Sequence, residues 1–200
     1  MLYRTINGVA VVVLALAVVS CAGPQGRIME DSEQDHVGAR AAGAAAFDRL
    51  VTGSVSKLLG SHHAAHAGAG KLKVAVLRID NASAEELGDW QEQIFDLIST
   101  SVNQSGRYET VSVRYVDAAL RETRLRRDDL FLPAKRRQFL GILERDDNPA
   151  QVLLFPKLSS GTTRGDGIGQ RNYLLTLELV DVASGKDYRV AERIRKAYRR

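Results

Sequence analysis

Apolar and polar residues alternate from 173 to 182, and this pattern constrains the possible folds of the chain more than any other. The large apolar residues on one face of this expected strand are Tyr173, Leu175, Leu177 and Leu179. Such period-two alternation is typical of a strand with one buried face. Ser184 and Gly185 then predict a turn into a last strand from about Asp187 to Ile194. The sequence therefore predicts a C-terminal antiparallel hairpin.

Helical and extended patterns alternate before this hairpin. Helical spacing is expected at 41–59, 83–104, 115–123 and from Pro133 onward, and strands are expected at 73–79, 108–113 and 151–158. The apolar strand at 73–79 is typical of a central position in a sheet, and Asp80-Asn81 should end it. The order α-β-α-β-α-α-β-β-β predicts a single α/β domain with a mixed β-sheet packed by helices.

Three local signals refine these elements. Ser83 and Glu86 have the spacing of a capping box, which places the start of the second helix at Ser83. Pro156 predicts a ladder break, a bulge or a strand end. The glycine-rich stretch 161–170 predicts a loop between the strand at 151–158 and the strand at 173–182.

The first residues of the chain are typical of a bacterial lipoprotein signal. Arg4 precedes an unbroken apolar run at 9–19, about half of the ~20 residues that a transmembrane helix needs. The run ends in Val-Val-Ser-Cys21, which resembles the lipobox that precedes an acylated cysteine. Cys21 is the single cysteine of the chain, so it has no disulfide partner there. The alternatives are an ordinary signal peptide or an uncleaved anchor with a chance cysteine.

This signal divides the chain into three expected parts. They are a signal peptide at 1–20, a flexible tether at 21–40 that carries lipidated Cys21, and a globular domain at 41–200. Stable anchoring takes about two acyl chains, such as palmitate, and an acylated cysteine provides them. Ala22 stands where known sorting signals place Asp for inner-membrane retention. The expected location is therefore the outer membrane, with the domain facing the periplasm.

The chain is mildly basic, with a net charge of +4, and its positive residues gather in two places. One cluster lies at 121–127. The other supplies the candidate partner-binding residues, which are Arg193, Arg195, Lys196, Arg199 and Arg200. Basic clusters can mark nucleic-acid sites, but an exported lipoprotein rarely meets nucleic acid. An acidic protein, an anionic lipid or a cell-wall polymer is the expected partner, and a solvated face without a specific partner is the alternative.

Candidate catalytic motifs do not have the context that catalysis requires. Gly165, Gly167 and Gly169 join two expected strands and lack the GxGxxG spacing of a dinucleotide loop. The histidines at 62, 63 and 66 lie among Ala and Gly, which favours adventitious metal binding at most. Asp128-Asp129 and Asp146-Asp147 are typical of turns or caps. The sequence predicts a binding protein without catalytic residues, a metal site or a cofactor.

Several segments carry a family resemblance: 47–59, 74–81, 102–106, 108–113, 151–155 with 159–161, and 174–186. From about Ala46 onward they resemble the LpoB family of outer-membrane lipoproteins. The final hairpin is shared with a wider group that includes CsgG-type lipoproteins and the N-terminal domain of TolB. The LpoB resemblance implies a regulatory protein that binds and activates a periplasmic bifunctional penicillin-binding protein, and so controls peptidoglycan synthesis and cell shape.

The chain departs from that family in two places. LpoB proteins carry a long proline-rich tether, whereas the expected tether here contains Pro24 alone, and the usual tryptophan near the start of the last strand is replaced around 187–189. The alternative function is a structural component of an envelope secretion or assembly complex related to CsgG. Pore formation is not expected, because the loops at 60–70 and 161–170 are short for pairs of membrane strands of about 9–11 residues each.

Overall fold

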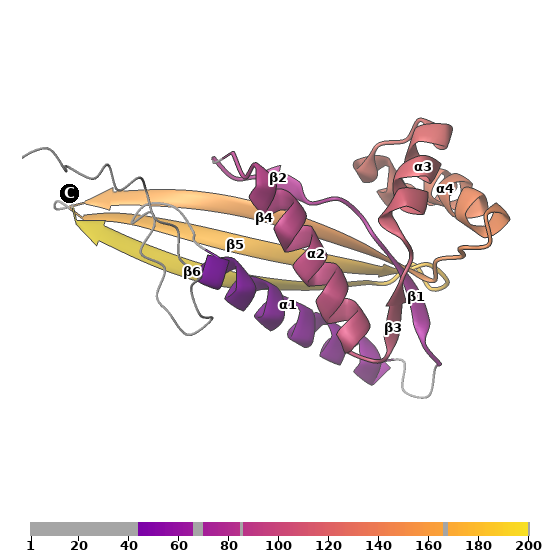
Figure 1. Cartoon of the computed structure of the whole chain (residues 1–200), viewed down its shortest axis with the longest axis horizontal. Coiled ribbons are helices and arrows are strands. Elements are labelled where there is room, and N and C mark those ends of the chain that lie inside the picture. Colours follow the sequence, from indigo (N-terminus) through magenta and orange to yellow (C-terminus); the bar gives the residue numbers. More distant parts are fainter. Residues whose placement is uncertain (1–43, 66–69, 85, 166–167, 200) are drawn as a thin grey trace, which may run out of the picture. The chain divides into compact units, whose positions relative to one another are not determined.

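The computed structural model describes residues 44–65, 70–84, 86–165 and 168–199 (Figure 1). The helices are α1 (Ala44–Ala65), α2 (Asp89–Gln104), α3 (Val113–Thr123), the 3-10 helix η1 (Arg127–Phe131) and α4 (Pro133–Arg145). The strands are β1 (Leu72–Val76), β2 (Asp80–Ala82), β3 (Tyr108–Thr110), β4 (Val152–Gly165), β5 (Ile168–Asp181) and β6 (Asp187–Arg199). Among these residues, no helix is both long and apolar enough to cross a bilayer.

The strands form one mixed sheet in the order β3-β1-β4-β5-β6, and β2 also pairs with β4. β1 runs parallel to β3 and β4, and β2 runs parallel to β4, whereas β5 is antiparallel to both β4 and β6. This arrangement confirms the predicted α/β class, the mixed sheet and the C-terminal antiparallel hairpin. β1 is central, as its apolar sequence predicts, because its residues contribute alternately to two hydrophobic cores.

Each core covers one face of the sheet. On the first face, α1 and α2 pack against apolar side chains that include Leu154, Leu175 and Leu177. On the second face, α3, η1 and α4 pack over one end of the sheet, against Leu153 and Phe155. Figure 1 shows β4, β5 and β6 continuing well beyond α3 and α4. The second face is therefore covered over part of its length.

The expected capping box at Ser83 is wrong, because α2 begins at Asp89 after Gly88. The backbone N–H and hydroxyl of Ser83 donate instead to the side-chain oxygen of Asn81, at 3.1 and 2.6 Å. Such a local hydrogen bond competes with helix formation. Asp80 and Asn81, the residues expected to end the strand at 73–79, belong to β2. β2 pairs with β4 after a short interruption of the chain's strand structure.

Pro156 lies inside β4 rather than at its end. The parallel ladder from β1 stops at Leu154, and the ladder from β2 starts at Lys157. Proline has no N–H to donate, and it falls in the gap between these two ladders. The predicted ladder break is therefore confirmed on the side of β4 that faces β1 and β2. On the other side, Pro156 stays paired with Leu177 of β5.

The loop expected at 161–170 is wrong for the described residues on either side of 166–167. Pairing between β4 and β5 continues as far as Gly165 and Ile168, and β6 follows β5 to Arg199. Backbone pairing with two neighbouring strands outweighs the low strand propensity of glycine. The first helix also extends further than expected, to Ala65.

Candidate functional site

The second face of the sheet carries a surface that the described helices leave uncovered. Along β4, β5 and β6, residues of the first core occupy alternating positions, and the residues between them point to this second face. We call this surface the open face; its exposed and half-buried residues are Lys157, Ser159, Gly161, Asn172, Leu174, Thr176, Arg189, Ala191, Arg193 and Arg195. The cross-strand register gives rows across it, such as Ser159, Leu174 and Arg193.

Strand alternation divides the basic cluster that the sequence predicted. Arg193 and Arg195 are exposed on the open face. Lys196 follows the opposite alternation, on the side where Ile194 packs against the first core beneath α1. Arg199 ends β6, but its side chain and Arg200 lie outside the described residues. The structure therefore brings together two of the candidate residues, Arg193 and Arg195.

These two arginines border a hollow of about 500 Å³ that is also lined by Leu174 and Ala191. Leu174 lies opposite Arg193 in the β5–β6 ladder. The small side chain of Ala191 leaves room beside it. The hollow is thus lined by two apolar residues and two arginines.

Other cations of this region already have carboxylate partners. Arg189 pairs with Glu178 on the neighbouring strand. Asp80 of β2 lies 3.5 Å from Lys157 and 3.6 Å from Arg127. In contrast, Arg193 and Arg195 form no ion pair with any described residue. Their charges are available to a ligand that enters the hollow.

The basic cluster at 121–127 is not one surface patch, because the side chain of Arg127, the first residue of η1, is directed inward toward the sheet. Burial lowers the pKa of its guanidinium, an effect that nearby Asp80 partly offsets. The guanidinium lies over the ring of Phe155, 5.6 Å from its centroid, and its Nε has no hydrogen-bond partner in the part of the chain described. Sequence reasoning could not find this placement, because burial of Arg127 depends on the packing of η1 against the sheet.

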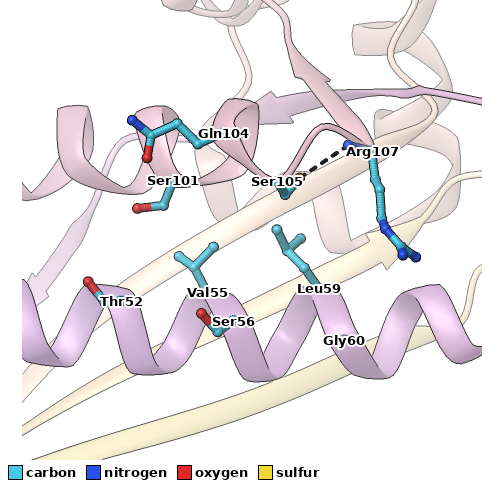
Figure 2. Close-up of a pocket in the computed structure, with 9 residues that line it drawn as sticks. All are labelled: Thr52, Val55, Ser56, Leu59, Gly60, Ser101, Gln104, Ser105 and Arg107. Carbon is cyan, nitrogen blue, oxygen red and sulfur yellow. Dashed lines mark hydrogen bonds between the residues drawn. The ribbon is translucent and has the colours of Figure 1, made fainter.

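A second concavity, of about 450 Å³, lies between α1 and α2 (Figure 2). Its floor is apolar, and hydroxyl and amide side chains line its sides; the lining residues are Thr52, Val55, Ser56, Leu59, Gly60, Ser101, Gln104, Ser105 and Arg107. The Ser105 hydroxyl donates to the Val102 carbonyl and accepts from the Arg107 N–H at 3.4 Å. Arg107 is the one ionisable residue among those lining it, so this groove has no acid–base pair.

The histidine cluster is structural where the structure describes it. His62 is fully buried, and its Nδ1 lies 2.6 Å from the Tyr108 hydroxyl. The side chains of His63 and His66 lie outside the described residues. Among described residues, no group of three His, Cys, Asp or Glu side chains could hold a metal ion.

The paired aspartates have the capping and turn roles that the sequence predicted. The Asp129 carboxylate accepts hydrogen bonds from the Lys135 ammonium at 2.5 Å and from the Arg126 N–H at 2.8 Å. These bonds, the first above all, lower the pKa of Asp129. Asp146 and Asp147 form the turn after α4, where Asp147 has φ 60°. Neither pair belongs to a group that could hold a metal ion among the described residues.

The fold of the chain is similar to that of known protein domains. The LpoB C-terminal domain from Salmonella enterica aligns with a TM-score of 0.50 at 17% identity, covering 72% of this chain and 97% of that domain. The same domain from Escherichia coli aligns with a TM-score of 0.50 at 17% identity, covering 74% and 97%. No family model and no curated protein matches the sequence. The chain therefore has an LpoB-like fold.

Proposed function

We propose that the chain is an outer-membrane lipoprotein that binds and activates a periplasmic bifunctional penicillin-binding protein. The LpoB-like fold supports this class of function, and the sequence of the first 21 residues supports a lipid anchor at Cys21. Residues 1–43 lie outside the described part of the structure, so the signal peptide, the tether and the lipidation of Cys21 belong to the proposal.

One structural observation carries the binding role. Arg193 and Arg195 border a hollow that Leu174 and Ala191 also line, on a face that the described helices leave uncovered, and no described carboxylate pairs with them. A surface of this kind suits a protein partner, because apolar anchors and complementary charges both contribute to association. It holds no paired acid and base of the kind that catalysis requires. The proposed role is therefore regulatory, without substrate turnover by this chain.

Activation would proceed by differential binding. A regulator that binds the active state of a synthase more tightly shifts its population toward that state, with a coupling free energy of about 1–3 kcal/mol. The tether must allow contact with an inner-membrane partner. Fully extended at ~3.3 Å per residue, the expected tether spans roughly 60 Å. The docking region of the synthase should therefore lie within this reach of the outer membrane.

The test is glycan-strand polymerisation by each bifunctional penicillin-binding protein of the same organism. The regulator is the mature chain, residues 21–200, with Cys21→Ser so that it is soluble without acyl chains. We expect the cognate synthase to accelerate about 5- to 150-fold, the range that this coupling permits. If none of these synthases binds or accelerates, the activator role fails, and the role in an envelope assembly complex takes its place.

A further inference from the structure

Two exposed apolar residues stand beside the open face. Phe131, at the end of η1, is 42% exposed although its ring stacks on Phe155, with centroids 4.5 Å apart. Leu132, the next residue, is 53% exposed. Phe155 shares a cross-strand row with Glu178 and Arg189. η1 therefore forms a wall at the end of the open face where the covered part of the sheet begins (Figure 1).

The wall and the hollow lie on the same face of the sheet. Arg193 at the hollow lies four positions further along β6 than Arg189, whose row is next to the wall. At about 3.3 Å per residue this is roughly 13 Å along the strand. We call this surface the docking corner; it consists of Phe131, Leu132, Leu174, Ala191, Arg193 and Arg195. A short extended segment of a partner is long enough to contact both ends.

We propose that the docking corner binds an acidic segment of a protein partner, in which carboxylates alternate with apolar side chains. The carboxylates pair with Arg193 and Arg195, while apolar side chains enter the hollow over Leu174 and contact Leu132. This inference deepens the proposed function by naming the surface and the chemistry of the partner, and it rests on that function for the partner's identity.

Charge complementarity specifies an acidic occupant. Asp80 and Glu178 already pair with the cations nearest the wall, whereas Arg193 and Arg195 have no carboxylate among the described residues. The planar guanidinium group matches a carboxylate with two parallel hydrogen bonds. A second copy of the chain docked through the same corner would bring these arginines toward one another, because a two-fold interface pairs a patch with itself. An acidic partner meets no such repulsion.

The shape favours a protein segment over an anionic membrane. A flat bilayer meets projecting groups, but Leu174 lines a hollow between the two arginines and Ala191. The backbone of Leu132 is held in place, because its N–H donates to the Asp129 carbonyl at 3.0 Å and Pro133 begins α4 directly after it. Little backbone freedom is therefore lost when a partner contacts Leu132, which suits this residue as an anchor.

The test is an NMR titration of the ¹⁵N-labelled 21–200 chain with Cys21→Ser. Two ten-residue peptides serve as probes: one alternates Asp and Leu, and the other alternates Lys and Leu. We expect the acidic peptide to shift the amides of Leu132, Leu174, Ala191, Arg193 and Arg195, and the basic peptide to leave them unchanged. Arg193→Glu with Arg195→Glu should weaken acidic-peptide binding at least about tenfold, as loss of two charge-assisted contacts implies.

A matched control carries the same change of charge elsewhere. Arg49→Glu with Arg107→Glu alters two exposed arginines on the α1 and α2 side of the domain, and it should change binding less than about twofold. Equal weakening by both double variants, shifts confined to the α1–α2 groove, or absence of binding would overturn the proposal. Binding to phosphatidylglycerol vesicles that requires Arg193 and Arg195, without peptide binding, would overturn it in favour of a lipid surface.

Polymerisation assays separate this inference from the proposed function. If Arg193→Glu with Arg195→Glu activates the synthase as well as the unsubstituted chain does, the docking corner is wrong and the activator function stands. If the acidic peptide binds the docking corner but no synthase of the organism responds, the docking corner stands and the activator function fails. Loss of both peptide binding and activation in the double variant, with the control unaffected, supports both.

Discussion

The buried imidazole of His62 in α1 lies 2.6 Å from the hydroxyl of Tyr108 in β3. The Tyr188 ring of β6 meets the same imidazole edge-on, with centroids 4.9 Å apart. β3 and β6 are the two ends of the strand order in the described sheet. His62 therefore links the last turns of α1 to both of these strands, and the contact stabilises the position of α1 on the sheet.

Tyr108→Phe should destabilise the domain by about 1–3 kcal/mol, because it removes a hydrogen bond from a buried imidazole. Urea unfolding followed by circular dichroism measures the change. Tyr115→Phe is the matched control, since Tyr115 is 45% exposed, and it should alter the free energy of unfolding by less than about 0.5 kcal/mol. Similar values for the two variants would contradict a structural role for the His62 contact.

Leu130 and Leu132, at the end of η1, should differ strongly in their contribution to stability. Leu130 in η1 is fully buried, whereas Leu132 is 53% exposed. Leu130→Ala should cost about 2–5 kcal/mol, because it leaves a cavity in the second core, while Leu132→Ala should cost less than about 1 kcal/mol. Thermal unfolding of both variants tests this. A large loss with Leu132→Ala would mean that Leu132 supports the fold and is not available as a docking anchor.

The sequence could predict the core of the fold because burial imposes periodicity. Alternation along 173–182 placed Leu175 and Leu177 in the first core, and continuous apolarity placed 73–79 at the centre of the sheet. The start of α2 could not be predicted in the same way. The choice between Ser83 and Asp89 depended on which partner the Ser83 hydroxyl finds, and Asn81 competed successfully for it.

The sequence predicted the charged residues of the candidate site but not its apolar ones. Positive charge near the end of the chain indicated Arg193 and Arg195, but spacing alone did not separate them from Lys196, because the separation needs a strand with a known buried face. The contribution of Phe131 and Leu132 had no sequence signal. Apolar residues before Pro133 are equally consistent with a core position, and only the packing of η1 leaves them exposed.

The free energy of unfolding at acidic pH should depend on Asp129. Hydrogen bonds from Lys135 and from the Arg126 N–H lower the pKa of Asp129. A carboxyl with a lowered pKa in the folded state contributes stability above its unfolded pKa, and this contribution is lost as the pH falls through the folded value. Asp129→Asn should therefore be less stable than the unsubstituted domain at pH 7, and the difference should shrink below about pH 4.

Urea unfolding at several pH values between about 2.5 and 7 measures this convergence. Asp128→Asn is the control, since Asp128 is the exposed neighbour in the same 3-10 helix. A stability difference for Asp129→Asn that stays constant across this range would show that the carboxylate charge does not stabilise the start of α4.

Cys21→Ser should release the chain from the membrane. The thioether and the acyl chains require the cysteine sulfur, and about two chains are needed for stable anchoring. Fractionation of cells should move the variant from the outer-membrane fraction to the soluble periplasmic fraction. Mass spectrometry of the unsubstituted mature protein should find a triacylated N-terminal Cys21, and an unmodified thiol there would rule out the anchor.

Adjacent residues of β6 should differ in their effect on partner association. Arg195 is exposed on the open face, while Lys196 alternates to the side of α1. At about 0.1 M salt, charges act over about 10 Å, so a contact on the open face involves Arg195 more strongly. Arg195→Glu should slow association with the synthase several-fold and flatten its salt dependence, whereas Lys196→Glu should have a smaller effect. Stopped-flow measurements across a salt series test this, with circular dichroism to check the fold. Equal effects of the two reversals would place the contact at the edge of β6 instead of on its open face.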